Sequence, residues 1–386
     1  MTQIKKNVYW IIMVVLLVFP TMIYINKIKI LTTAEVAEEY GDYEYTVNGQ
    51  NATLTKYNGN DECVSVPDHI NGYIVTAIGD RAFADCSSIN SIILPESVTY
   101  LGYSFISGTQ ITSITIPKSV TGVGAETHGD FGKAYGPLTG AMELTEVVFE
   151  EGMTSIPAYM CRTTYNDDWS SNTINNIKMI RMPDSIENIG DYAFYNCDNI
   201  ESVIMPKSLK SIGREAYYDC DNISKIEFIY NPETEINIGY EAFCSCDKLN
   251  DIGLTENVTE IGNCAFADCS SINSIILPES VTYLGYSFIS GTQITSITIP
   301  KSVTGVGAET HGDFGKAYGP LTGAMELTEV VFEDGMTSIP AYMCRTTYSG
   351  NESSDTRNNI KTIQMPDSIE NIGDYAFYNC DNIDDV

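Results

Sequence analysis

Apolar residues return along this chain with a period much longer than that of a single helix or strand. From residue 78 onward, an apolar residue that is usually followed by Gly, and then by Ala-Phe or a similar pair, recurs mostly every 22 to 26 residues, with four intervals of 33. The motif is clearest at residues 189–211, "IGDYAFYNCDNIESVIMPKSLKS". A fixed period of about 20 to 30 residues predicts a solenoid, in which one coil cannot bury its apolar face alone. The apolar anchors of the repeats are Ile78, Leu101, Val123, Ile156, Ile189, Ile212, Ile238, Ile261, Leu284, Val306, Ile339 and Ile372.

Each repeat contains one segment with the pattern of a short strand. The segments "NSIILP" and "TSITIP" alternate and are rich in β-branched residues, and a proline follows them. Such a run predicts a strand, and the proline ends it because it lacks a backbone donor. Stacked coils then place these strands side by side in a curved parallel sheet. The "IGxxAFxxC" segment is expected to return along the opposite wall, with Gly supplying the bend and Phe a large core residue.

The array contains a long internal duplication. The segment "FADCSSINSIILPESVTYLGYSF" occupies residues 83–105 and returns unchanged at 266–288, an offset of 183. The match extends over residues 78–203 and 261–386, which differ at 13 of 126 aligned positions. We therefore expect three regions: a membrane anchor or signal segment at 1–34, a linker and N-terminal cap at 35–77, and a repeat array at 78–386 whose last repeat is incomplete.

The repeat motif resembles that of the BspA-like class of leucine-rich repeats, which share "AFxxCxxLxxIxIPxSVxxIG". The segments "TVNGQNATLTKYNGN" and "VPDHINGYIVTAIG" before the array resemble the hairpin-like cap of such proteins. A cap is needed because the first coil would otherwise expose an apolar end and an open strand edge. The resemblance implies a mostly β, right-handed leucine-rich-repeat solenoid with a curved parallel sheet and an N-terminal cap. It also implies surface display and adhesion or protein binding, and no catalysis.

The N-terminus carries a membrane-directing signal. Residues 8–25, "VYWIIMVVLLVFPTMIYI", form an apolar run of 18 residues without a charge, with lysines at 5 and 6 before it and at 27 and 29 after it. This length fits either a membrane-spanning helix or the core of a signal peptide. Two lysines separate the run from a cleavage position after Ala34, which favours an uncleaved anchor. With the short N-terminus inside, the chain would be displayed at the cell surface or secreted.

Composition agrees with a folded, acidic chain. Apolar residues make up 43% of the sequence, which is enough for a core, although the formal charge is -30. The 51 acidic side chains outnumber 21 basic ones. Because nucleic acid binding depends on clustered Lys and Arg, this balance argues against a nucleic acid partner.

The residues that could carry chemistry fit structural roles better. Six of the 11 cysteines recur eight residues after an anchor, which favours a column of buried thiols over disulfides: Cys86, Cys197, Cys220, Cys246, Cys269 and Cys380. The histidines His69, His128 and His311 offer no Ser or Cys triad. The remaining extra cysteines lack the partners of a zinc site, and aspartates such as Asp198 and Asp221 fit turns better than a calcium ladder. We therefore predict no catalytic residue, cofactor or metal site.

The differences between the two copies suggest where a partner binds. Six of them fall in residues 166–174 against 349–357, an insertion, and three more fall at strand positions predicted to point outward. Drift at exposed positions by itself predicts that loops and exposed strand residues vary. The second interpretation is a partner-binding surface formed by Trp169, Met179, Arg181, Ser202, Thr362, Gln364 and Asp385. A second insertion, identical at 126–136 and 309–319, is glycine-rich and is expected to leave the coil as a loop.

The sequence therefore favours a non-catalytic, surface-displayed module that binds or adheres to a protein ligand of a host, another bacterium or a matrix. The binding would use the exposed sheet face and the inserted loops. The alternative is a structural spacer or stalk without a specific ligand. An enzyme is disfavoured because no nucleophile, base and orienting group can be named.

Overall fold

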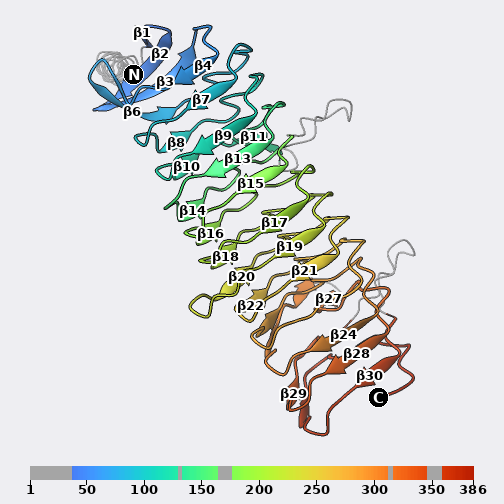
Figure 1. Cartoon of the computed structure of the whole chain (residues 1–386). Helices are drawn as coiled ribbons and strands as arrows, with labels where there is room; N and C mark the ends of the chain where they lie inside the picture. Colours follow the sequence, from blue (N-terminus) through green and yellow to red (C-terminus); the bar gives the residue numbers. More distant parts are fainter. Residues whose placement is uncertain (1–36, 129–132, 164–175, 312–315, 346–358) are drawn as a thin grey trace, which may run out of the picture.

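The computed structural model describes residues 37–128, 133–163, 176–311, 316–345 and 359–386. Within these ranges the chain forms strands and turns but no α-helix. The coils stack one after another into an elongated, mostly β solenoid (Figure 1), as the period predicts. The predicted membrane-directing segment at 1–34 lies outside the described residues. In the part that is described, no helix is long and apolar enough to cross a membrane.

One wall of the solenoid, here called the long-strand wall, consists of the predicted strands. Its strands are β4 (Cys63–Ser65), β7 (Ser91–Ile93), β9 (Ser113–Ile116), β13 (Glu146–Phe149), β15 (Met179–Arg181), β17 (Ser202–Ile204), β19 (Lys225–Glu227), β21 (Asp251–Gly253), β24 (Ser296–Ile299), β28 (Glu329–Phe332) and β30 (Thr362–Gln364). All their pairings are parallel and join equivalent repeat positions, such as Val147 with Ile114 and with Ile180. Hydrogen bonding divides the wall into four sheets, β4-β7, β9-β13-β15, β17-β19-β21 and β24-β28-β30.

A second wall, here called the short-strand wall, consists of parallel strands that each end at an anchor residue. Its strands are β8 (Tyr100–Leu101), β10 (Gly122–Val123), β14 (Ser155–Ile156), β16 (Asn188–Ile189), β18 (Ser211–Ile212), β20 (Ile236–Ile238), β22 (Val258–Ile261), β23 (Tyr283–Leu284), β25 (Gly305–Val306), β29 (Ser338–Ile339) and β31 (Asn371–Ile372). The sequence predicted only one sheet. Most of these strands have two residues, which is too short for an alternating pattern to be recognised.

The glycine that follows ten of the twelve anchors is required by close approach of two backbones. A Cβ built at Gly190 would lie 2.4 Å from the backbone nitrogen of Ala158 in the preceding coil. The prediction that this glycine supplies the bend is wrong, because the left-handed turn positions carry other residues, such as Tyr192 with φ 58° and Asn196 with φ 59°. Because glycine has no side chain, the backbones of consecutive turns can lie against each other at the position after the anchor.

The turns that follow the short strands form the third wall. Alternate amides in one turn donate to carbonyls of the next turn, as Tyr192 N does to Arg214 O at 2.9 Å and Phe194 N to Ala216 O at 2.8 Å. The buried backbone polar groups of the turns are thereby satisfied between coils. The third wall is therefore hydrogen-bonded along the array like the other two, although it contains no strand.

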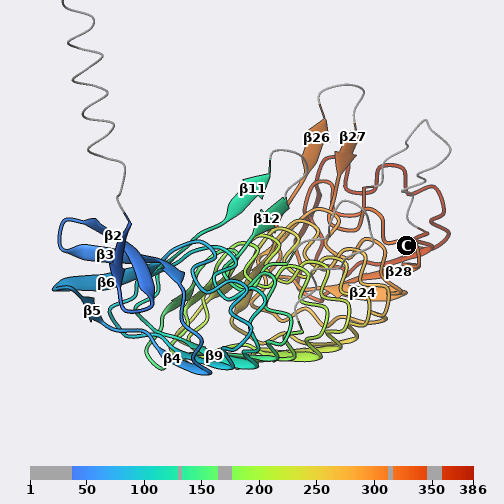
Figure 2. The same cartoon turned by 90° about the horizontal axis from the view of Figure 1, so that it is seen from above.

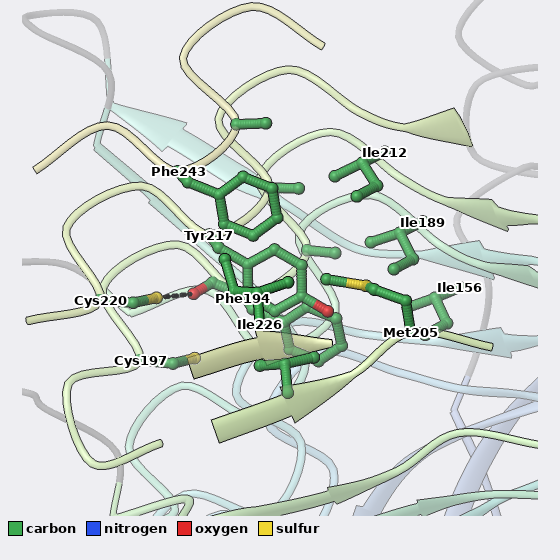
Figure 3. Packing of buried hydrophobic residues seen from close by; sticks show 14 of the residues in the cluster. Ile156, Ile189, Phe194, Cys197, Met205, Ile212, Tyr217, Cys220, Ile226 and Phe243 are labelled. Atoms are coloured by element: carbon green, nitrogen blue, oxygen red, sulfur yellow. Dashed lines mark hydrogen bonds between the residues drawn. The ribbon is translucent and has the colours of Figure 1, made fainter. Parts of the chain in front are cut away.

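The core is a column of stacked aromatic rings enclosed by the three walls (Figure 3). The ring centroids of Phe194 and Tyr217 lie 4.9 Å apart, those of Tyr217 and Phe243 5.2 Å, and those of Phe243 and Phe266 5.5 Å. All four side chains are fully buried. The prediction that the "AF" position supplies the large core residue is confirmed.

Antiparallel strands cover the N-terminal end of the array. They are β1 (Glu38–Tyr40), β2 (Tyr43–Asn48) and β3 (Asn51–Tyr57), followed by β5 (His69–Ile70) and β6 (Tyr73–Ile78). Strand β3 pairs in parallel with β6, and β6 pairs with β8, so this hairpin continues the short-strand wall. Tyr45 and Leu54 bury their side chains completely. The hairpin thus occupies the place where the sequence predicts a cap.

The glycine-rich insertions form hairpins instead of loops. Strand β11 (Glu126–His128) pairs antiparallel with β12 (Lys133–Tyr135), and β26 (Glu309–His311) pairs with β27 (Lys316–Tyr318). Figure 2 shows both hairpins projecting to the same side of the solenoid, away from the long-strand wall. The duplication therefore gives the array two equivalent projections.

Candidate partner-binding surfaces

The outward side chains of the long-strand wall form an exposed surface, here called the outer face. Because side chains alternate along a strand, Ser202 and Ile204 of β17 are exposed while Val203 between them is buried. Large apolar side chains stand on this face: Ile93 is 64% exposed and Ile204 62%. Ile276, the duplicate of Ile93, lies in a segment that forms no named strand and is 83% exposed.

The predicted site residues that the structure describes lie on this face. Met179 and Arg181 are exposed on β15, and Ser202 is exposed on β17. In the second copy, Thr362 and Gln364 lie on β30, where Thr362 is partly exposed and Gln364 exposed. Asp385 is exposed and forms an isolated parallel bridge with Thr362. Trp169 lies outside the described residues.

Arg181 is held by its own chain. Its Nε lies 2.5 Å from Oε1 of Glu146 on the neighbouring strand. Ser113 donates a hydrogen bond of 3.0 Å to the other oxygen of that carboxylate. The bonds from Arg181 and then Ser113 lower the pKa of Glu146. Arg181 is therefore a charged but restrained part of the outer face.

The second copy keeps this contact without the positive charge. Gln364 Nε2 donates to Oε1 of Glu329 at 2.7 Å, and Ser296 donates to Oε2 at 2.7 Å. The exchange of Arg181 for Gln364 thus preserves a hydrogen bond to the glutamate and removes a positive charge from the surface. The two copies of the duplication, here called the first and second block, therefore share the same strands but carry different charges on the outer face.

A groove opens beside each hairpin. The first, about 350 Å³, is lined by Arg81, Tyr103, Ser104, Ser107, Tyr135, Thr139 and Gly140. The second, about 340 Å³, is lined by Tyr240, Glu241, Cys244, Cys264, Ala267, Asp268, Tyr286, Ser287, Ser290 and Tyr318. Neither groove was expected from the sequence. The exchange of Arg81 for Cys264 between the two copies is the one sequence difference that falls on their linings.

The foot of each hairpin is fixed to the next coil. The buried hydroxyl of Thr139 accepts a hydrogen bond from Gly136 N at 2.9 Å and donates one to Arg162 O at 2.7 Å. A Cβ at Gly136 would lie only 1.9 Å from Tyr159 O, so no other residue fits this backbone. Both features recur at Gly319 and Thr322.

Two buried arginines lie within sets of three tyrosines. The guanidinium carbon of Arg162 lies 5.6, 4.8 and 4.3 Å from the ring centroids of Tyr159, Tyr192 and Tyr195. The second copy repeats this arrangement with Arg345 over Tyr342, Tyr375 and Tyr378. Stacking of an arginine guanidinium on tyrosine rings therefore occurs at equivalent positions of both copies.

The recurring cysteines form a column of buried thiols. Cys220 donates through Sγ to Phe194 O of the preceding coil at 3.1 Å (Figure 3), and Cys246 and Cys269 make the same contact at 3.2 and 3.0 Å. Cys197 is also fully buried, whereas Cys86 and Cys380 at the ends are partly exposed. None of the eleven cysteines, all of which the structure describes, forms a disulfide. Burial raises the pKa of Cys220 well above its usual value, so this thiol is a core group and a poor nucleophile.

An aspartate directly follows several of these cysteines on the third wall. Burial, followed by the charges of Asp221 and Asp219, raises the pKa of Asp198 to about 7. Burial and the charges of Asp219 and Asp247 raise the pKa of Asp221 to about 6, despite the opposing effect of Lys248. Among the described residues, no three His, Cys, Asp or Glu side chains are grouped so that they could hold a metal ion.

Comparison with known proteins gives the following matches. The family model described as the BspA type leucine rich repeat region matches in six copies, over residues 62–178, 171–234, 187–314 and 322–386. A leucine-rich cell surface protein of Faecalibacterium prausnitzii is 20% identical, with 92% of this chain and 95% of that chain covered and a TM-score of 0.37. The pneumococcal vaccine antigen PcpA is 15% identical, with 88% and 98% covered and a TM-score of 0.39. No curated protein sequence matches.

Proposed function

The chain belongs to the family of BspA-type leucine-rich repeat proteins, and we propose that it is a surface-displayed, non-catalytic module that binds a protein partner. The partner, a protein of a host, another bacterium or a matrix, contacts the outer face and the inserted segments. In this proposal the apolar run at residues 8–25 attaches the chain to the membrane and the repeats are exported.

The observation that carries the proposal is the exposure of large apolar side chains on the outer face. Ile93, Ile204 and Ile276 occupy the same outward position of their coils and are each more than half exposed. Met179, at the other outward position, is 47% exposed. Single exposed isoleucines are ordinary, but Met179 and Ile204 stand on the outward side of consecutive strands of the long-strand wall, β15 and β17, and large apolar side chains that lie near one another on an exposed face support a role in protein binding.

The difference between the two blocks supports the same proposal. Met179 and Arg181 of the first block correspond to Thr362 and Gln364 of the second, while the strands that carry them keep the same pairing. The scaffold is thus constant and the exposed chemistry differs. A binding surface that discriminates between partners needs such local differences in charge and apolar area.

A binding assay with outer-face variants tests the proposal. The chain is titrated over immobilised purified matrix and cell-surface proteins, and the variant Met179→Lys with Ile204→Lys is compared with Asn188→Lys. Asn188 is exposed on the short-strand wall, so its variant adds charge without changing the outer face. We expect saturable binding that falls at least tenfold in the double variant and is unchanged in the control. Absence of saturable binding to every protein, or equal loss in both variants, would favour the spacer.

A further inference from the structure

The two grooves beside the hairpins have the same walls. Each residue of the first block has its duplicate 183 positions later. The lining pairs are Tyr103 with Tyr286, Ser104 with Ser287, Ser107 with Ser290, and Tyr135 with Tyr318. The walls therefore give both grooves the same aromatic and hydroxyl surface.

One of the duplicated lining positions differs between the grooves. Arg81 lines the first groove, and its Nη2 donates to Oδ2 of Asp85 at 3.2 Å. The duplicate of Arg81 is Cys264, while the duplicate of Asp85 remains an aspartate, Asp268. The backbone is the same at both positions, with φ 55° at Arg81 and 54° at Cys264. The first groove thus contains a guanidinium of its own chain where the second contains a thiol.

The second groove is also more acidic. Glu241, supplied by the preceding coil, lines it together with Asp268. In the described part of the chain neither carboxylate forms an ion pair with Lys, Arg or His. Burial raises the pKa of both groups, and the charge of Asp247 adds to the effect at Asp268. Two negative charges at a partly buried site favour a cationic ligand.

The aromatic walls fit a planar cation. Tyr240, Tyr286 and Tyr318 line the second groove, and the rings of Tyr286 and Tyr318 have centroids 6.2 Å apart. Elsewhere in the chain, Arg162 and Arg345 lie over three tyrosine rings each. Arg214 lies over Tyr240 but is paired with Glu215 and does not line the groove. Guanidinium groups combine stacking on aromatic rings with hydrogen bonds to carboxylates, which a compact ammonium does less well.

We propose that the second groove binds the guanidinium of an arginine side chain presented by a protein partner, in the place that Arg81 takes in the first groove. This site adds a specific contact to the proposed protein-binding function. It rests on that function because the natural ligand is then an arginine of the bound protein. The carboxylates of Glu241 and Asp268 would accept its hydrogen bonds, and the tyrosines would stack on its plane. The net charge of -30 favours the approach of such a basic segment.

The experiment uses a peptide whose only charge is the guanidinium, N-acetyl-Gly-Arg-Gly-amide. The control peptide carries citrulline, which keeps the shape and loses the charge. The full chain is labelled with ¹³C-tyrosine, and resonances are assigned with Tyr→Phe variants. At low salt we expect the resonances of Tyr240, Tyr286 and Tyr318 to shift saturably with the arginine peptide and not with the citrulline peptide. Equal shifts with both peptides, or none, would overturn the proposal.

The duplication supplies matched variants in both directions. Cys264→Arg places in the second groove the side chain that the first groove already accommodates, and it should abolish the shifts. Arg81→Cys removes the guanidinium from the first groove, whose lining has no counterpart of Glu241, and should therefore leave Tyr103 and Tyr135 with much smaller peptide-dependent shifts than those of the second groove. An unchanged thermal midpoint shows that each variant is folded. Retained shifts in Cys264→Arg would contradict the proposal.

A final comparison separates this site from the outer face. The variant Ile204→Lys should leave the peptide titration unchanged even where it weakens binding of a protein partner. If Cys264→Arg weakens binding of that partner as well, the groove contributes to recognition. If the partner binds Cys264→Arg with wild-type affinity, the groove has no part in it, although the outer-face proposal stands.

Discussion

Asp198 should make the folded chain less stable as the pH rises. Its side chain is partly buried on the third wall, and its Oδ1 atom is buried with no hydrogen-bond partner among the residues that the structure describes. Burial, followed by the charges of Asp221 and Asp219, raises its pKa from 3.8 to about 7. Replacement by Asn keeps the shape of the side chain and removes the charge, so Asp198→Asn tests the effect directly.

The size of the effect follows from the pKa shift. A shift of about 3 units corresponds to about 4 kcal/mol at about 1.4 kcal/mol per unit. Because the group is partly open to solvent, screening reduces this to about 2 kcal/mol. Below about pH 4 the carboxyl is protonated in both the folded and the unfolded chain. As the pH rises from about 4 to 7 the unfolded chain releases its proton first, so the free energy of unfolding falls, and above about pH 7 the loss is complete.

The assay is urea unfolding of the wild type and of Asp198→Asn at pH 4 and pH 8, followed by circular dichroism. Because a solenoid can open locally, hydrogen exchange of residues 192–228 provides a second, local measure. We expect the variant to gain about 2 kcal/mol at pH 8 and close to nothing at pH 4. The matched control is Asp381→Asn, the same repeat position in an exposed setting. An equal gain at both pH values, or the same gain in the control, would refute the reasoning.

Other predictions concern packing. Phe243→Ala removes the middle of the aromatic column and should lower the free energy of unfolding by about 3 to 5 kcal/mol in urea titrations; a loss below about 1 kcal/mol would contradict tight packing. Gly136→Ala introduces a Cβ that would lie 1.9 Å from a backbone oxygen and should lower the thermal midpoint, whereas Gly253→Ala, with its nearest such oxygen at 3.5 Å, should change it little. In thiol labelling of the native chain, exposed Cys63 should react quickly and buried Cys220 only after unfolding; rapid labelling of Cys220 would show that the thiol column is open.

The outer face was largely predictable from the sequence, whereas the grooves were not. The alternation of apolar and polar residues in the strands identifies Met179 and Arg181 as outward positions. It does not reveal that Glu146, 35 residues earlier, accepts a hydrogen bond from Arg181. In the same way the exchange of Arg81 for Cys264 is visible in the aligned copies. Its meaning depends on Glu241 from one coil and Tyr318 from a hairpin, which only folding brings to the same groove.

The period, the coil, the position of the long strands and the core role of the Phe and Cys columns could all be read from the order of residues. This was possible because each of these features is local and is repeated along the array. The short-strand wall, the hairpin form of the insertions, the left-handed turn residues and the contents of the two grooves became visible only in the folded chain. These depend on contacts between neighbouring coils, where residues that lie tens of positions apart in the chain become adjacent, and no local pattern encodes that proximity.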